Sequence, residues 1–129
     1  MTVKDVLDNE RSKKISLIKD FDKSDSVNCF YCNGKSAWLD KATRVGLVNS
    51  LTMEKSAGRI DTQLWLNGEM LCMKIDDALK MLVALELYAK DCYSVTETHI
   101  SNVNKLDDLN KVYNYKYTKG YPKKLMFNI

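Results

Sequence analysis

Apolar residues recur at helical spacing in three stretches of the chain. The first covers residues 3–20, and Thr2 with Asp5 approximates a capping box at its start. The second begins after Asp40, a helix-capping residue, and ends at Gly58, which accepts the left-handed conformation that closes many helices. Its apolar positions are Ala42, Val45, Leu47, Val48 and Leu51. The pattern therefore predicts an N-terminal helix and a second helix between Asp40 and Gly58.

The third helical stretch is the longest and the most apolar. It begins at Asp76 or Asp77, is apolar on nearly all sides from Ala78 to Ala89, and continues as an amphipathic pattern to Val103. A helix that is apolar all round is buried on most of its sides, so we expect its first half in the core. We expect the amphipathic second half to project from that core.

Two Asn-Gly pairs, each between segments rich in β-forming residues, predict two β-hairpins. Asparagine and glycine accept the positive φ angles of a type I′ turn, and a two-residue turn fixes the register of the strands that it joins. The two turns are Asn33-Gly34 and Asn67-Gly68. The predicted cross-strand pairs are Phe30 with Ala37 in the first hairpin, and Ile60 with Ile75, Asp61 with Lys74, Leu64 with Leu71 and Trp65 with Met70 in the second.

These elements predict an α+β fold, in which the two hairpins form one small antiparallel sheet packed against helices, with a long central helix and an N-terminal helix. A chain of 129 residues, 45% of them hydrophobic, is one domain long and buries a core without disulfides. We therefore expect a single domain over residues 1–129, with the N-terminal helix in 1–22 and an α+β core with an aromatic tail in 27–125. Gly46 inside the second helix predicts close packing against a neighbour, because glycine there costs about 1 kcal/mol relative to alanine.

Charge and composition narrow the classes of partner. The 20 basic and 17 acidic residues are interspersed and give a net charge of +3, so no overall attraction to nucleic acid or to a membrane follows. The longest apolar run, near residues 81–85, is far shorter than the roughly 18 residues that cross a bilayer. The charged N-terminus lacks the pattern of a secretory signal, so we expect the chain to stay in the cytoplasm where it is made.

Cysteine and histidine are the residues most suited to chemistry, and each has a structural alternative. Cys29 and Cys32 have the C-x-x-C spacing of a zinc knuckle, but Cys72 and Cys92 stand apart, so the second half of a site is missing. We expect free thiols of a reducing compartment and keep zinc as an alternative. His99 is the only histidine and no partner at triad spacing accompanies it. We therefore expect no catalytic residue, no cofactor and no metal, and thus no enzyme.

The C-terminal stretch 110–124 interleaves lysines with tyrosines and carries no acidic residue. Tyrosine is an efficient anchor in protein interfaces, although aromatic rings among lysines also stack on single-stranded nucleic acid. The alternating tyrosines predict an extended segment with one aromatic face. We expect a protein interface, because the rest of the chain has no matching basic surface for nucleic acid. The candidate interface residues are Tyr93, His99, Tyr113, Tyr115, Tyr117 and Tyr121.

Five motifs occur in order between Trp38 and Pro122. They are Trp38-Leu39-Asp40 with Arg44, Leu64-Trp65-Leu66-Asn67-Gly68, Ile75-Asp76, Leu106-Asp107-Asp108-Leu109 and Gly120-Tyr121-Pro122. This order, which covers about two-thirds of the chain, resembles a phage-associated domain of unknown function that is often found toward the C-termini of tail-fibre and other tail-related proteins.

The resemblance implies a small virion or tail-assembly component with no catalytic residues to carry over. The expected function is that of a non-enzymatic structural protein of a phage or prophage tail or virion, made in the host cytoplasm and present in the virion in several copies. Its expected partners are other tail or virion proteins or further copies of itself. Two alternatives stay open, a tail-fibre assembly chaperone and a small nucleic-acid-binding accessory protein. Presence in purified particles separates the first function from both others.

Overall fold

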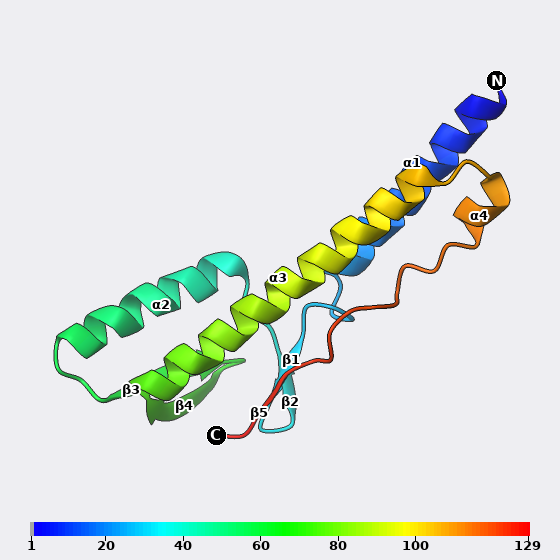
Figure 1. Cartoon of the computed structure of the whole chain (residues 1–129). Helices are drawn as coiled ribbons and strands as arrows, with labels where there is room; N and C mark the ends of the chain where they lie inside the picture. Colours follow the sequence, from blue (N-terminus) through cyan, green and yellow to red (C-terminus); the bar gives the residue numbers. More distant parts are fainter. Residues whose placement is uncertain (1) are drawn as a thin grey trace. The chain divides into compact units, whose positions relative to one another are not determined.

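The computed structural model describes residues 2–129 and has the α+β fold that the sequence predicts (Figure 1). The helices are α1 (Val3–Lys23), α2 (Lys41–Ser56), α3 (Ile75–Lys105) and α4 (Leu109–Tyr113). The strands are β1 (Phe30–Cys32), β2 (Lys35–Ala37), β3 (Asp61–Leu66), β4 (Glu69–Lys74) and β5 (Met126–Phe127). The long central helix and the N-terminal helix are both confirmed, each reaching two or three residues further than the sequence pattern.

The described chain divides into two compact units. Unit 1 contains residues 2–28 and 90–123, and unit 2 contains residues 29–89 and 124–129. Helix α3 contributes its first half to unit 2 and its second half to unit 1. That the chain behaves as a single domain stays a prediction.

The predicted turns and registers of both hairpins are confirmed. Asn33, Gly34, Asn67 and Gly68 all have positive φ angles, as a type I′ turn requires. The register pairs are those expected from the turns, for example Phe30 with Ala37 and Leu64 with Leu71. Ile60 and Ile75 lie just beyond the ladder, joined by a backbone hydrogen bond of 2.8 Å from the Ile75 N–H.

The two hairpins lie in separate sheets, not in the one sheet that the pattern indicated. Strands β3 and β4 form a two-stranded sheet, whereas β1 and β2 belong to a three-stranded sheet of order β2-β1-β5. Strand β5 pairs with β1 in parallel, with Tyr31 beside Met126. The second edge of β1 is therefore taken by a segment from the far end of the sequence. A strand of two residues carries no alternating pattern that would have predicted it.

Local signals set the helix ends as expected. Thr2 and Asp5 form both hydrogen bonds of a capping box, and the Asp40 side chain accepts from the Thr43 N–H at 2.8 Å. These hydrogen bonds, from Thr2 and Thr43 respectively, lower the pKa values of the two carboxyl groups. One prediction is wrong: a Cβ added at Gly46 would meet nothing within 4 Å, so no close neighbour explains that glycine.

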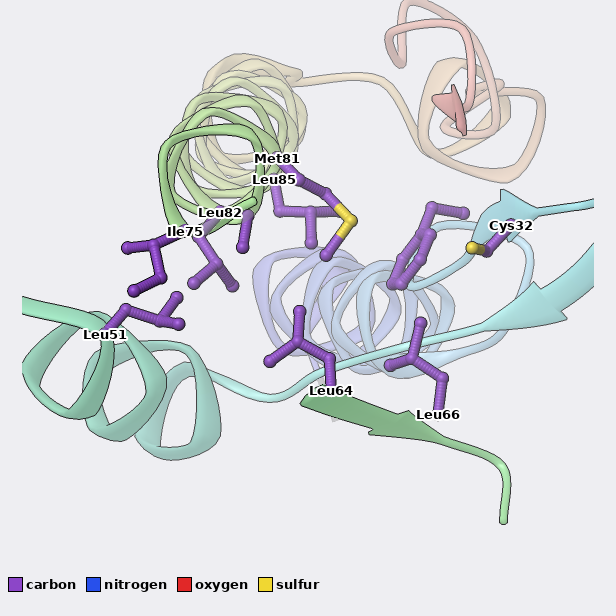
Figure 2. Packing of buried hydrophobic residues seen from close by; sticks show 10 residues of the cluster. Cys32, Leu51, Leu64, Leu66, Ile75, Met81, Leu82 and Leu85 are labelled. Carbon is purple, nitrogen blue, oxygen red and sulfur yellow. The ribbon is translucent and has the colours of Figure 1, made fainter. Parts of the chain in front are cut away.

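The core of unit 2 lies between the first half of α3, α2 and the two sheets. Figure 2 shows Leu64 and Leu66 pointing from β3 toward Met81 of α3, and Leu51 of α2 beside Ile75 and Leu82. The alternating burial of β3, with every second residue inside, follows from the period of a strand with one buried face. Trp38, Leu125 and Phe127 pack against this cluster from the segments around it.

The second half of α3 lies outside unit 2, in line with the prediction that it leaves the core of the first half, but it is part of unit 1 and is not exposed on all sides. Within unit 1, Cys92, Thr96 and Val103 are all buried. Helix α1 runs beside this half of α3 (Figure 1), and its Asp22 accepts a hydrogen bond from Thr96 at 2.8 Å. The physical reason is that α1 has an apolar face of its own, centred on the fully buried Ile18, which needs a cover.

Candidate interaction surfaces

All six predicted interface residues lie in unit 1, and four of them form a connected group of rings with Phe21 of α1. The ring of Phe21 lies 5.9 Å from that of Tyr117 and 5.4 Å from that of Tyr121, measured between centroids. His99 lies 5.5 Å from Tyr115 and 6.0 Å from Tyr121 in the same measure. We call these five residues the aromatic cluster. Offset and edge contacts at such distances add stability beyond the area that they bury.

His99 is half-buried and both of its ring nitrogens are occupied. Its Nε2 lies 2.7 Å from the Lys119 carbonyl oxygen, and its Nδ1 lies 2.6 Å from the Tyr115 hydroxyl. A carbonyl only accepts, so Nε2 carries the proton, and in the neutral ring Nδ1 accepts from the Tyr115 O–H. The histidine therefore anchors the tail to α3 and has no free nitrogen for a substrate.

A second group of hydrogen bonds joins the tail to α1 and α3 within unit 1. The Thr96 hydroxyl donates to Asp22 at 2.8 Å, so its oxygen accepts from the Tyr121 O–H at 2.7 Å. Burial is the main reason that the pKa of the Tyr121 phenol is raised above its ordinary value of 10.0. The phenol thus stays protonated and remains a donor across the physiological pH range.

The aromatic face of the tail is turned toward the helices, not toward solvent. Tyr117 meets Phe21 edge-on, and the Lys14 ammonium lies 5.8 Å from the Tyr117 ring centroid. The same ammonium donates to the Tyr113 carbonyl at 3.0 Å. Of the predicted interface residues, only Tyr93 and Tyr113 are largely exposed. The role of the six residues in binding a partner stays a prediction.

Unit 2 carries an exposed apolar surface that sequence reasoning missed. Val45 and Val48 on α2 and Val83 and Leu87 on α3 form this surface, which we call the helix face; Val83 and Leu87 are each 57% exposed. A groove of about 240 Å³ lies between the two helices. Its lining residues are Arg44, Val45, Val48, Asn49, Leu82, Val83 and Glu86.

An ion pair at this groove holds the two helices together. The Arg44 Nε lies 2.9 Å from a Glu86 carboxylate oxygen, and Arg44 also donates to the Leu39 carbonyl at 2.6 Å. The Arg44 guanidinium lies 5.4 Å from the Trp38 ring centroid, a cation–π contact. These contacts bury Arg44 and hold its side chain in place. One side of the groove beside the helix face is therefore polar.

The first half of α3 is buried on most sides, as predicted, but one of its apolar sides is exposed. Ala78, Met81 and Leu85 are buried, whereas Val83 and Leu87 point away from the core. An α-helix packs against a core along one stripe of its surface, and the first half of α3 has further apolar residues outside that stripe. This surplus is the sequence signal that would have revealed the helix face.

The outer side of the β3–β4 hairpin presents a second, smaller apolar group. Trp65 is 66% exposed, and its cross-strand neighbour Met70 is exposed beside it. The neighbouring Leu64 and Leu66 point into the core, as strand alternation requires. The tryptophan of the Leu-Trp-Leu motif is therefore a surface residue.

The thiols do not gather around a common centre. No disulfide joins any two cysteines within residues 2–129; Cys29, Cys32 and Cys92 are buried and Cys72 is exposed. Burial raises the pKa of the Cys32 thiol, which disfavours the thiolate that binds metals. Across residues 2–129, no three or more His, Cys, Asp or Glu side chains are grouped to hold a metal ion. None of the helices in this range combines the length and apolar character that crossing a membrane requires.

The sequence matches no family model and no curated protein, and the fold matches no solved structure. The resemblance to a phage-associated domain therefore stays an expectation drawn from motif order.

Proposed function

We propose that this chain is a non-enzymatic protein that works by binding other proteins. The observation that carries the proposal is the helix face, where Val45, Val48 and Val83 line one groove between α2 and α3 and the exposed Leu87 follows Val83 by one turn of α3. Single exposed apolar residues are common on any protein, but a group of them that lines one groove is typical of an interaction site. Burying such side chains against a partner removes apolar area from water, which drives association.

A narrower proposal places this binding in a phage or prophage particle. There the chain is a structural protein of the tail or virion, present in several copies and in contact with other tail proteins. The support for this step is the order of motifs from Trp38 to Pro122. The two motif residues Leu64 and Leu66 lie in the core, whereas Trp65 is on the surface and offers an aromatic anchor.

The two alternatives, nucleic-acid binding and assembly chaperoning, need different surfaces. Single-strand nucleic-acid binding needs stacking rings, and Tyr115, Tyr117 and Tyr121 are engaged with α1 and α3. Only the exposed lysines of the tail then remain to attract nucleic acid. Nucleic-acid binding is therefore a weaker proposal than protein binding. An assembly chaperone needs the same apolar surface as a structural protein, so particle composition has to separate the two.

The proposal of a structural role is tested by mass spectrometry of phage particles. The particles are purified from cells that make the tagged chain. We expect the wild-type chain in the particles at a fixed ratio to other tail proteins. Incorporation of the double variant Val83→Ser/Leu87→Ser is expected to fall at least about tenfold, because two apolar side chains no longer gain free energy from burial against the partner. Ile60→Ser, which changes another exposed apolar residue of unit 2, is the matched control and is expected to be incorporated normally.

Each other outcome has a definite meaning. Absence of the wild-type chain from particles, with binding to a tail protein during assembly, contradicts the structural role and favours the chaperone. Equal incorporation of the double variant and the control shows that the helix face is not the contact. Circular dichroism of each variant shows whether it is folded, so a loss of incorporation caused by unfolding is recognised.

A further inference from the structure

Strand β5 is held on β1 by a small number of contacts. The Tyr31 N–H donates to the Leu125 carbonyl at 2.9 Å, and the Asn33 N–H donates to the Phe127 carbonyl at 2.8 Å. Leu125 and Phe127 are only half-buried, and Met126 between them is 69% exposed. The strand therefore has a specific place on β1 but little buried area.

Side chains on β1 and in its turn select the segment that fits this place. The Asn33 Oδ1 accepts a hydrogen bond of 2.8 Å from the Ile129 N–H. Asn33 also has a φ angle of 51° in the turn between β1 and β2, so one residue forms the turn and holds the C-terminal segment. The Phe127 ring meets the Phe30 ring edge-on, with 5.7 Å between the centroids. The edge of β1 thus fits a strand with a phenylalanine at this position.

The contacts of β5 are few enough for the strand to leave β1 while the core stays folded. Strand β5 has two residues, and residues 114–125 before it form no helix or strand. Segments with few buried contacts open locally at a lower free-energy cost than the core. Opening leaves the N–H groups of Tyr31 and Asn33 unpaired at the edge of β1, beside the apolar contact with Phe30. An unpaired edge of this kind binds an added strand.

We propose that β5 is an exchangeable strand: it leaves β1, and residues 124–129 of a second copy take its place. The proposal rests on the proposed function, protein binding by a chain present in several copies. The segment of a second copy has the sequence that the edge of β1 already holds, so it forms the same hydrogen bonds. Reciprocal exchange loses no contact, since each copy gives one strand and receives one. The attached strand competes at an effective concentration in roughly the millimolar range, so exchange is expected where copies are crowded, as in a particle.

Hydrogen exchange of single amides, followed by NMR, tests whether β5 opens locally. The protection factor of the Tyr31 amide is expected to be at least about tenfold lower than that of Leu82 in the core of α3. Asn33→Gly keeps the backbone of the turn and removes the bond to Ile129, so it is expected to lower protection at Tyr31 a further severalfold. Asn67→Gly, the same change in the other Asn-Gly turn, is the matched control and is expected to leave Tyr31 unchanged. Exchange of the Tyr31 amide only through global unfolding overturns the proposal.

A fluorescent peptide of residues 123–129 tests whether the edge of β1 accepts a strand from outside. Phe127→Ala in the full chain weakens the attached strand while the peptide keeps its phenylalanine, so the peptide is expected to bind at least about tenfold more tightly than to the wild type. Met126→Ala, at the exposed position of the same strand, is the matched control and is expected to bind like the wild type. Equal binding of the peptide to these two variants overturns the proposal. Leu125→Ala replaces Phe127→Ala if circular dichroism shows that the latter is unfolded.

Sedimentation velocity of the full chain over about 10 to 1,000 μM tests whether the donor is a second copy. The dimer fraction is expected to rise with concentration and to fall at least about twofold with excess peptide, which takes the same place on β1. A peptide carrying Phe127→Ala is expected to have no such effect. A chain that stays monomeric, or a dimer that the peptide does not dissociate, overturns exchange between copies. The Val83→Ser/Leu87→Ser variant is expected to dimerise normally, so failure of β5 exchange is distinct from failure of partner binding at the helix face.

Discussion

A few polar side chains decide how the C-terminal tail is held in unit 1. Thr96 is buried, and its single hydroxyl serves both Asp22 and Tyr121, whereas His99 uses both ring nitrogens on Tyr115 and Lys119. No buried side-chain nitrogen or oxygen in residues 2–129 lacks a partner. A fully satisfied network of this kind favours one arrangement of the segment that it binds. The tail therefore has a defined position despite its lack of regular structure.

Tyr121→Phe is expected to lower the free energy of unfolding by about 1 kcal/mol, because it removes the hydrogen bond to Thr96 and keeps the ring. Tyr113→Phe, at an exposed tyrosine of the same segment, is expected to change it by less than about 0.5 kcal/mol. Urea unfolding followed by circular dichroism measures both. Equal effects of the two substitutions contradict the role assigned to Tyr121.

The glycines of the turns and helices show how single elements constrain the backbone. Gly68 has a φ angle of 77° in the β3–β4 turn, where an L-residue with a side chain is strained. Gly46 lies inside α2 without a positive φ angle. A Cβ added at either position meets nothing within 4 Å, so packing is the same in both cases. Backbone conformation alone then separates the two sites.

The same substitution is therefore expected to have opposite effects at these two glycines. Gly68→Ala is expected to destabilise the chain by about 1 to 2 kcal/mol, because alanine resists positive φ angles. Gly46→Ala is expected to stabilise it by about 0.5 to 1 kcal/mol, since alanine loses less backbone entropy in a helix. Thermal unfolding of the two variants provides the measurement, and a stabilised Gly68→Ala contradicts the turn assignment.

The continuous helix α3 is the element that the two compact units share. Both tryptophans, Trp38 and Trp65, belong to unit 2, whereas the aromatic cluster belongs to unit 1. Tryptophan fluorescence therefore reports on unit 2 alone. A single domain unfolds in one cooperative transition, so a change in one unit affects the signal from the other.

If the chain is a single domain, Tyr121→Phe in unit 1 is expected to shift the urea midpoint of tryptophan fluorescence as much as that of circular dichroism. Tyr113→Phe serves again as the control, with neither midpoint moved. An unchanged fluorescence midpoint beside a lowered circular dichroism midpoint would show two independent domains.

Features defined within a few residues were predicted correctly from the sequence. The Asn-Gly turns, their registers and the caps at Thr2 and Asp40 all depend on contacts between neighbours, and each is confirmed. The candidate interface was predicted less well, because a tyrosine that packs inside a chain and one that binds a partner belong to the same residue type. Tyr121 and Tyr113 differ only in what the fold brings beside them.

Hydrophobic spacing and turn chemistry thus specify which elements form, since both act through backbone geometry over short distances. They do not specify which elements meet. The pairing of Tyr31 with Met126, the cover of α3 by α1, and the exposure of Val83 and Leu87 all depend on competition between distant segments for the same apolar surfaces. Such competition is resolved only when the whole chain packs. The reason is that the free energy of each contact depends on the apolar surface area that it removes from water.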